Sequence, residues 1–155
     1  LFKVSPIIND EDINHPVLAD FAEDVRLLGY DFEPAEALPG DDVRLTLYWQ
    51  ALQPPKGDFT VFTHLLDPDG QLQAQQDSQP QGGMYPTYLW QNSERIEDVY
   101  TLTVDPQAPP GEYNFAVGMY TLESLQRLQL TTPDGVSNAD NRLLLKGPDI
   151  IHPES

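Results

Sequence analysis

Residues 43–50 read VRLTLYWQ, and this stretch decides the fold class of the chain. Its odd positions, from Val43 to Trp49, carry apolar side chains, whereas its even positions, from Arg44 to Gln50, carry polar or amphipathic ones. A period of two places successive side chains on opposite faces of an extended strand. We therefore expect a β-strand here, with one face in a hydrophobic core and the other face directed to solvent.

The next run along the chain, FTVFTHLL at 59–66, is apolar on both faces of an extended strand. A strand with this composition is typical of the middle of a sheet, where other elements cover both faces. The first strand and this one therefore predict a core built between layered sheets.

A turn signal follows directly, because residues 67–70 read Asp-Pro-Asp-Gly. Proline stands where φ must be preset, and glycine stands where a left-handed residue is needed. We expect a type I turn with a bulge at the glycine, which would pair Leu66 with Leu72 and His64 with Ala74. The strand after the turn would then return antiparallel to the one before it.

Other segments repeat the strand pattern, and prolines separate them. The additional strand-like runs are 25–33, 95–104, 113–120, 127–130 and 142–146. The chain has 15 prolines, which fall between the strong apolar runs, and proline cannot donate to a sheet ladder. No window shows a convincing helical period. We predict an all-β, antiparallel β-sandwich of about eight strands, either immunoglobulin-like or jelly-roll-like.

The length of 155 residues fits one domain. We expect an irregular lead-in at 1–20, a sandwich domain at 21–147 and a tail at 148–155. The chain begins at Leu1 rather than Met, so we expect it to be a piece of a longer protein or a processed product. The polar and aromatic connection at 78–94 is long for a compact domain, and such loops are often functional or carry structure of their own.

The chain is strongly acidic, with a formal net charge of −17. Nucleic acid and anionic lipid are therefore poor partners, because their phosphates would be repelled.

There is no cysteine, which excludes disulfides, thiol catalysis and thiolate metal sites. No stretch has the length and apolarity of a membrane span, and no signal peptide is evident, so we expect no direct membrane insertion. An exposed edge strand could pair with another copy, which leaves a monomer or a weak dimer as the expected states.

His64 is the first candidate for catalysis, with Asp77 and Asp98 as its carboxylate partners. A histidine beside a carboxylate can act as a general base. The alternative is a partly buried histidine held in a structural polar cluster, and we favour it because no serine lies in a nucleophile-elbow context. We therefore predict no catalytic residue and a structural cluster of His64, Asp77 and Asp98.

Metal and cofactor sites are not expected either. The three histidines are His15, His64 and His152, and the sequence has no H-x-H or H-x-D pair. The acidic turn at 67–70 differs from a calcium loop, because it contains proline and lacks the glutamate that completes such a loop. The 25 acidic residues do not by themselves identify a glycosidase pair, whose separation the sequence cannot show.

The best candidates for ligand binding lie in the long connection. Tyr85, Tyr88 and Trp90 could stack on the C–H faces of a sugar, while Gln91 and Asn92 could bind its hydroxyls. Aromatic rings with polar neighbours are also usual at protein interfaces. The alternative is that Trp90 plugs one end of the sandwich, since tryptophan is usually highly buried.

Several short segments together form a pattern of their own. They are LGYD at 28–31, LYWQAL at 47–52, FTHLLD at 62–67 before Gly70, Gln75 with Asp77, Pro86 and Thr87 with Trp90, Asp98 with Tyr100, PGEY at 110–113, and VGMY at 117–120 with Arg127 and Leu128. From about Asp20 to Lys146 the chain resembles the soluble C-terminal β-sandwich that follows the membrane-embedded part of some bacterial glycosyltransferases. Those enzymes are similar to protein-mannosyl and lipid-linked-sugar transferases.

This resemblance implies a module on the extracytoplasmic face of a bacterial membrane, within a membrane-anchored parent. Catalysis in such proteins belongs to the membrane part, so no catalytic residue carries over to this chain. Our first hypothesis is a non-catalytic accessory module that serves as a scaffold or contacts the parent membrane domain, a partner or an acceptor. The second is a carbohydrate-binding module that uses the loop aromatics, and the third and weakest is a hydrolase with an unrecognised site.

Overall fold

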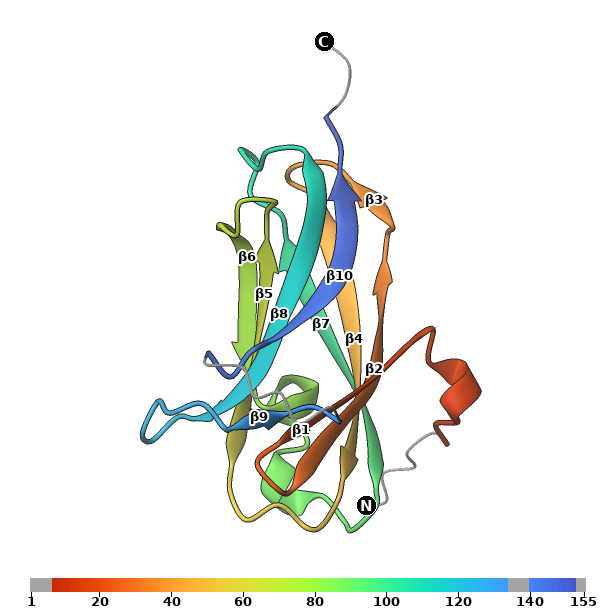
Figure 1. Ribbon diagram of the computed structural model, residues 1–155, viewed down its shortest axis with the longest axis vertical. Coiled ribbons are helices and arrows are strands. Elements are labelled where there is room, and N and C mark those ends of the chain that lie inside the picture. Colours follow the sequence, from red (N-terminus) through yellow and green to blue (C-terminus); the bar gives the residue numbers. More distant parts are fainter. Residues whose placement is uncertain (1–6, 134–139, 153–155) are drawn as a thin grey trace.

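The computed structural model describes residues 7–133 and 140–152, and its strands form two facing sheets of five strands each (Figure 1). In spatial order, the first sheet contains β7 (Arg95–Thr103), β4 (Asp42–Ala51), β2 (Val25–Glu33), β1 (His15–Phe21) and β9 (Leu130–Thr131). The second sheet contains β3 (Glu36–Ala37), β10 (Leu143–Ile150), β8 (Gly111–Thr121), β5 (Phe59–Leu66) and β6 (Leu72–Ser78). Short 3-10 helices form η1 (Asp10–Asp12), η2 (Pro80–Gly83) and η3 (Thr87–Leu89). None of the helices in the described ranges is long and apolar enough to cross a membrane.

The strand order makes this all-β sandwich immunoglobulin-like. Strand β4 lies between β2 and β7 in one sheet, and β8 lies between β5 and β10 in the other. This arrangement matches the B–E pairing and the C–F–G sheet of immunoglobulin domains. At the start of β8, the Tyr113 hydroxyl donates a 2.5 Å hydrogen bond to the Pro109 carbonyl, which is the tyrosine corner of such sandwiches. The predicted all-β sandwich is therefore confirmed, with ten strands among the described residues rather than about eight and with one parallel pair, β3 with β10, among antiparallel ones. The topology selects the immunoglobulin-like alternative.

The two-residue alternation of β4 builds the core as the sequence predicted. Its apolar positions from Val43 to Trp49 are fully buried and belong to the hydrophobic core between the sheets. Strand β5 has neighbours on both sides, and Phe62 is buried although it lies on the outer face of the second sheet. The expectation of a central strand covered on both faces therefore holds for β5.

The sandwich begins earlier and ends later than the sequence indicated. Strand β1 lies within the lead-in expected to be irregular, and β10 continues to Ile150, past the expected boundary at 147. Both segments contain β-bulges, between Pro16 and Ala19 in β1 and between Lys146 and Asp149 in β10. A bulge inserts an extra residue and interrupts the period of two, so the pattern conceals the strand.

The turn at 67–70 forms, but the register after it differs from the expected one. Leu66 pairs with Leu72 as predicted, whereas His64 pairs with Gln75 instead of Ala74. Ala74 pairs with Leu65, so the extra residue of the bulge lies in β6 after Leu72 rather than at the turn glycine.

The carboxylate of Asp67 holds this turn together. It accepts hydrogen bonds from the backbone N–H groups of Asp69 (2.8 Å) and Gln71 (2.9 Å) and from the side-chain amide of Gln73 (2.9 Å). Burial raises the pKa of Asp67, but the hydrogen-bond donors together lower it by a larger amount. The pKa of Asp67 therefore lies below its ordinary value. The ionised carboxylate therefore stabilises the turn.

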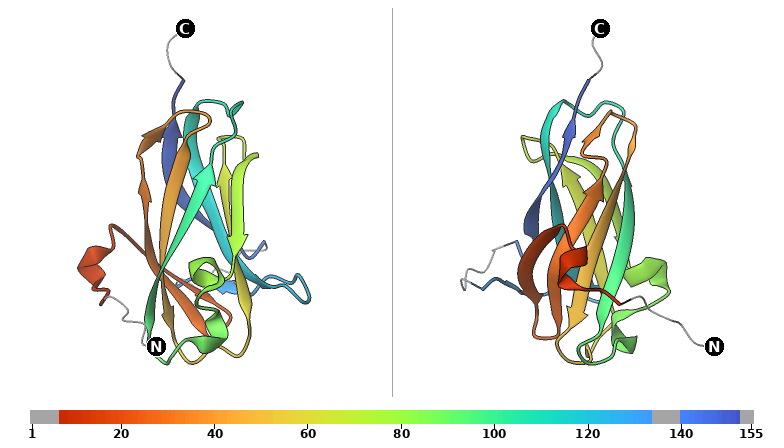
Figure 2. Two further views of the ribbon diagram at one scale, coloured as in Figure 1. Left: turned by 180° about the vertical axis from the view of Figure 1, so that it is seen from behind. Right: turned by 90° about the vertical axis from the view of Figure 1, so that its right-hand side faces the viewer.

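Glutamine side chains cover the outer edge of β7. The Thr101 N–H donates to Gln76 Oε1 of β6 at 2.9 Å, and Gln81 Nε2 of η2 donates to the Glu97 carbonyl at 3.0 Å. Figure 2 shows η2 beside β7 and β6 on this side of the sandwich. Backbone groups of an edge strand that would otherwise face solvent thus have side-chain partners.

Gly29 in β2 allows a close approach of β1. A Cβ atom at this position would lie 2.3 Å from the Ile13 side chain and 2.6 Å from the His15 carbonyl oxygen. Both distances are far shorter than van der Waals contact. The LGYD segment therefore needs glycine because another strand's backbone passes directly over it.

We predict that Gly29→Ala lowers the free energy of unfolding by about 1–3 kcal/mol, because β1 must move away from β2. Urea unfolding followed by tryptophan fluorescence measures this loss. Gly40→Ala is the control, since φ at Gly40 is +90° but no atom lies within 4 Å of the added Cβ. Gly40→Ala gives the cost of a positive φ without a clash, and unchanged stability of Gly29→Ala would contradict the close-approach explanation.

Candidate functional site

The connection between β6 and β7 folds back against the lower end of the sandwich (Figure 1). Trp90 is only 1% exposed and belongs to the core, where its indole N–H donates to the Tyr85 carbonyl at 3.0 Å. Tyr85 is half-buried, and its hydroxyl donates to Glu94 Oε1 at 2.6 Å. Tyr88 is 54% exposed. The three rings therefore do not form the shared stacking surface that the sequence suggested, and Trp90 instead plugs the end of the sandwich.

The two amides of the same loop lie on the surface. Gln91 and Asn92 are both exposed. The backbone N–H of Gln91 donates to Glu94 Oε1 at 2.9 Å, and its side-chain amide donates to the Leu89 carbonyl at 3.4 Å. Glu94 thus organises this part of the loop through Tyr85 and Gln91.

Thr87 fastens the loop to the rest of the sandwich. Its buried hydroxyl donates to the Gly57 carbonyl at 2.7 Å and accepts from the Phe59 N–H at 3.0 Å. The side chain therefore satisfies two backbone groups where the chain enters β5. The Pro86, Thr87 and Trp90 pattern of the sequence is explained by this attachment and by the buried indole.

We predict that Thr87→Val lowers the free energy of unfolding by about 1–3 kcal/mol, because a buried N–H and a buried carbonyl lose their partner. Thermal and urea denaturation measure the change. The control is Thr101→Val in β7, where the side chain is exposed and the change should stay within about 0.5 kcal/mol. Equal stability of Thr87→Val and wild type would show that the hydroxyl does not hold the loop.

Asp98 lies apart from His64 and Asp77, although the sequence analysis predicted one polar cluster of all three. It lies in β7 on the core side of the first sheet and is fully buried. Its carboxylate accepts hydrogen bonds from the Tyr100 hydroxyl (2.6 Å), the Gln81 N–H (2.7 Å) and the Trp49 indole N–H (3.2 Å). The expected three-residue cluster is therefore wrong for Asp98, because the alternation of β7 turns this side chain inward.

Burial raises the pKa of Asp98 to about 6, although its three hydrogen-bond donors act in the opposite direction. A carboxyl group that binds its proton more tightly in the folded state stabilises the fold when protonated. This contribution is fully present below the ordinary pKa of 3.8 and is lost as the pH rises through about 6.

We predict that the difference in unfolding free energy between wild type and Asp98→Asn falls by roughly 3 kcal/mol between pH 3.5 and pH 7. The variant serves as the reference because all other titrating groups are common to both proteins. Urea unfolding at several pH values measures the difference. A difference that rises with pH over this range would contradict the raised pKa.

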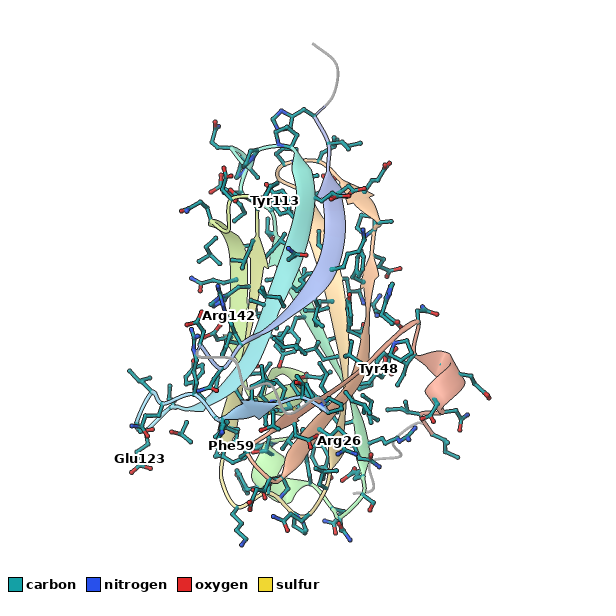
Figure 3. All side chains as sticks on the ribbon, in the orientation of Figure 1. Arg26, Tyr48, Phe59, Tyr113, Glu123 and Arg142 are labelled. Carbon is teal, nitrogen blue, oxygen red and sulfur yellow. The ribbon has the colours of Figure 1, made fainter. Side chains whose placement is uncertain are left out.

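His64 and Asp77 lie on the outer face of the second sheet, where they line a shallow pocket of about 210 Å³. We call it the outer pocket, and its lining residues are Phe62, His64, Asp77, Tyr120, Leu125 and Arg127. They come from β5, β6, β8 and the connection that follows β8. Figure 3 marks Glu123 at the tip of this connection, which projects from the sandwich.

Phe62 forms the floor of the outer pocket. Its ring lies over Gly118 of β8, where an added Cβ would approach it to 2.4 Å. The guanidinium carbon of Arg127 lies 4.5 Å from the centre of the same ring, within the range of a cation–π interaction. Arg127 Nη1 also donates to the Asp140 carbonyl at 2.8 Å. Both the ring and the guanidinium are therefore held in place.

The polar side of the pocket is formed by Tyr120, Asp77 and His64. The Tyr120 hydroxyl donates to Asp77 Oδ2 at 3.0 Å, and the His64 ring lies 5.1 Å from the centre of Phe62. His64 is half-buried and has no hydrogen-bond partner among the residues that the structure describes. Its pKa is lowered, first by burial and then by Arg127 and Arg142, against the opposing effect of Asp77. A neutral imidazole offers one donor and one acceptor to a ligand.

The described lining of the outer pocket offers a ligand both hydrogen-bonding groups and apolar surface. The sequence analysis considered His64 as a general base, and the hydroxyl among the described lining residues is that of Tyr120, which donates to Asp77. In the described part of the chain no group of three or more His, Asp or Glu residues could hold a metal ion. The sequence analysis did not assign Tyr120 and Arg127 to this site, because Tyr120 comes from β8 and Arg127 from the connection after it, both far along the chain from His64 and Asp77.

A larger hollow of about 610 Å³ lies on the outer face of the first sheet. Its charged groups already have partners, since Arg26 pairs with Asp20 at 2.7 Å and Arg95 with Asp10 at 2.7 Å. Much of the remaining wall is aliphatic, including Leu18. We therefore place the candidate site at the outer pocket, where the His64 imidazole has no hydrogen-bond partner within residues 7–133 and 140–152.

Comparisons with known proteins support the fold. No family model matches the chain, and no curated protein matches it. Among solved structures, the C-terminal domain of Wzt matches with a TM-score of 0.50 at 9% identity, over 96% of this chain and 88% of that one. At this identity the likeness concerns the fold alone, and it places the chain among β-sandwich domains.

Two further solved structures have lower TM-scores. The CARDB domain of a Pyrococcus furiosus protein, determined in complex with di-metal ions, has a TM-score of 0.44 at 10% identity and covers 84% of this chain and 97% of that one. A Niemann-Pick type C2 protein from the Japanese carpenter ant has a TM-score of 0.47 at 7% identity, and the match covers 84% of this chain and 95% of that one.

Proposed function

We propose that this chain is a non-catalytic accessory module of a larger membrane-anchored bacterial protein, of the glycosyltransferase kind that its sequence resembles. In this proposal the module stands on the extracytoplasmic side and contacts the parent, a partner or the acceptor of the sugar. One observation carries the proposal, namely the structural role of the residues that carry the sequence resemblance. Several of them stabilise the sandwich itself, which supports a structural or contact role for the module.

Four of these residues illustrate the point. Gly29 allows β1 to approach β2, Thr87 fastens the long loop, and Asp98 accepts three internal hydrogen bonds. Tyr113 closes the tyrosine corner. Because each side chain serves the fold, the shared pattern describes a stable module rather than a reaction, which supports an accessory role.

A carbohydrate-binding role is the second candidate, and the outer pocket favours it. The sequence placed such binding at the loop aromatics, but Trp90 is buried there and Tyr85 is held by Glu94. The outer pocket instead combines apolar surface with a carboxylate, a guanidinium and the His64 imidazole, which has no hydrogen-bond partner among the described residues. Small-molecule sites typically combine an apolar lining with a few well-placed polar groups.

The accessory proposal predicts a specific phenotype in the full-length parent. Removing this module should leave the membrane part able to cleave its sugar donor, while transfer to the native acceptor falls. Transfer assays in membranes, with donor hydrolysis measured in parallel, give both quantities. A control variant carries the module with Asp31→Asn on the outer face of the first sheet and should retain transfer.

Two results would overturn this proposal. The first is a parent gene that encodes no membrane spans. The second is turnover of glycoside or ester substrates by the purified chain that is lost in the His64→Ala variant.

A further inference from the structure

We infer that the outer pocket binds one sugar ring of a neutral glycan, by its hydroxyls on one side and its C–H groups on the other. This inference rests on the proposed role as a contact module and names the ligand class and the residues for it. The proposed binding site lies on the outer face of the second sheet and not at the aromatic residues of the loop after β6.

The shape of this face comes from the side chains that pair across the strands. At the level of His64, the neighbouring positions are Ala116 in β8 and Leu144 in β10. At the level of Phe62, the neighbours are Gly118 in β8 and Asp77 in β6. The Phe62 ring fills the space over Gly118, whereas the small side chain of Ala116 keeps the face low beside His64. A sugar ring can therefore approach the sheet closely at this point.

The hydrogen-bonding groups of the pocket match adjacent hydroxyls. Asp77 accepts from Tyr120 through Oδ2, and within the described residues its Oδ1 is available to accept from a sugar hydroxyl. Arg127 donates through Nη1 to the Asp140 carbonyl, and no described residue accepts from its other N–H groups. His64 adds one donor and one acceptor. A carboxylate and a guanidinium on the same pocket can serve as acceptor and donor to two neighbouring hydroxyls.

The apolar part of the ligand also finds a surface. Leu125 is 70% exposed at the mouth of the pocket, and the Tyr120 ring is partly exposed beside it. The C–H face of a sugar can rest on such a wall. The pocket of about 210 Å³ is smaller than the roughly 300–1,000 Å³ of sites for drug-sized ligands, which fits a single ring.

Charge favours a neutral sugar over an acidic one. Asp77 and Arg127 contribute opposite charges to the pocket, and the whole chain carries a net charge of −17. A polyanionic glycan would be repelled by this field. The fixed positions of Phe62 and Arg127 lower the entropy cost of binding, because these side chains are ordered before the ligand arrives.

The test uses the chain in solution with four probes: the methyl glycosides of mannose, glucose, galactose and rhamnose. We expect at least one to cause saturable shifts in ¹H–¹⁵N spectra, in the millimolar range, around β5, β6 and β8. Asp77→Asn and Arg127→Gln should each weaken that binding at least tenfold.

Matched controls lie on the outer face of the first sheet. There the Tyr48 hydroxyl donates to Asp31 Oδ2 at 2.9 Å, which repeats the pairing of Tyr120 with Asp77. Asp31→Asn should leave sugar binding unchanged. Leu125→Gly guards against loss of fold, because φ at Leu125 is +59°, a conformation that glycine adopts without strain. This variant should fold as well as wild type and bind the sugar more weakly.

Three results would overturn the inference. They are the absence of shifts with all four probes, shifts confined to the loop around Tyr88, and tighter binding of glucuronate than of the glucose glycoside. The accessory proposal fails on other grounds, namely unchanged acceptor transfer when the module is removed. The two ideas can therefore fail independently.

Discussion

The hydrogen bonds to the Asp98 carboxylate hold together the part of the sandwich where β4, β7 and η2 meet. It joins the Trp49 indole of β4, the Tyr100 hydroxyl of β7 and the backbone of Gln81 in η2. These partners come from two neighbouring strands and from the connection after β6. A buried carboxylate is tolerated only when such donors surround it. Its partners therefore fix where η2 lies, and η2 in turn fixes the start of the long loop.

The loop and the sheets then form one continuous core. Trp90 enters the core from the loop, and Thr87 ties the same loop to the residues that precede β5. Strand β5 carries core residues on one face and Phe62 and His64 on the other. The outer pocket thus stands on a strand that is held from both sides. A binding site on a rigid strand keeps its geometry better than a site on a loop.

The sequence predicted the layers of this fold because β4 and β7 alternate without interruption. It did not predict β1 or the full length of β10, because bulges interrupt the alternation in both. The direction of Asp98 could have been read from the alternation of β7, in which Tyr100 and Leu102 face the core. The buried Tyr100 hydroxyl two residues away was the signal that a partner was needed.

The candidate site was only partly accessible to sequence reasoning. His64 and Asp77 lie on strands joined by a tight turn, so their proximity follows from local pairing. Arg127 reaches the pocket through the connection after β8, and no periodic pattern describes that path. The loop aromatics attracted attention because exposed and buried rings look alike in a sequence. Burial of Trp90 depends on Tyr85 and the end of the core, which only the folded chain defines.

The glutamine side chains along β7 bear on how copies of this chain can crowd together. The Thr101 N–H and the Glu97 carbonyl on this edge are already engaged by Gln76 and Gln81, so β7 is a poorer template for a foreign strand at these positions. Glutamine amides thus protect this edge from pairing with another strand, as lysine or proline does at many sheet edges. Where many such chains stand close together, strand pairing between neighbours across this edge is therefore disfavoured.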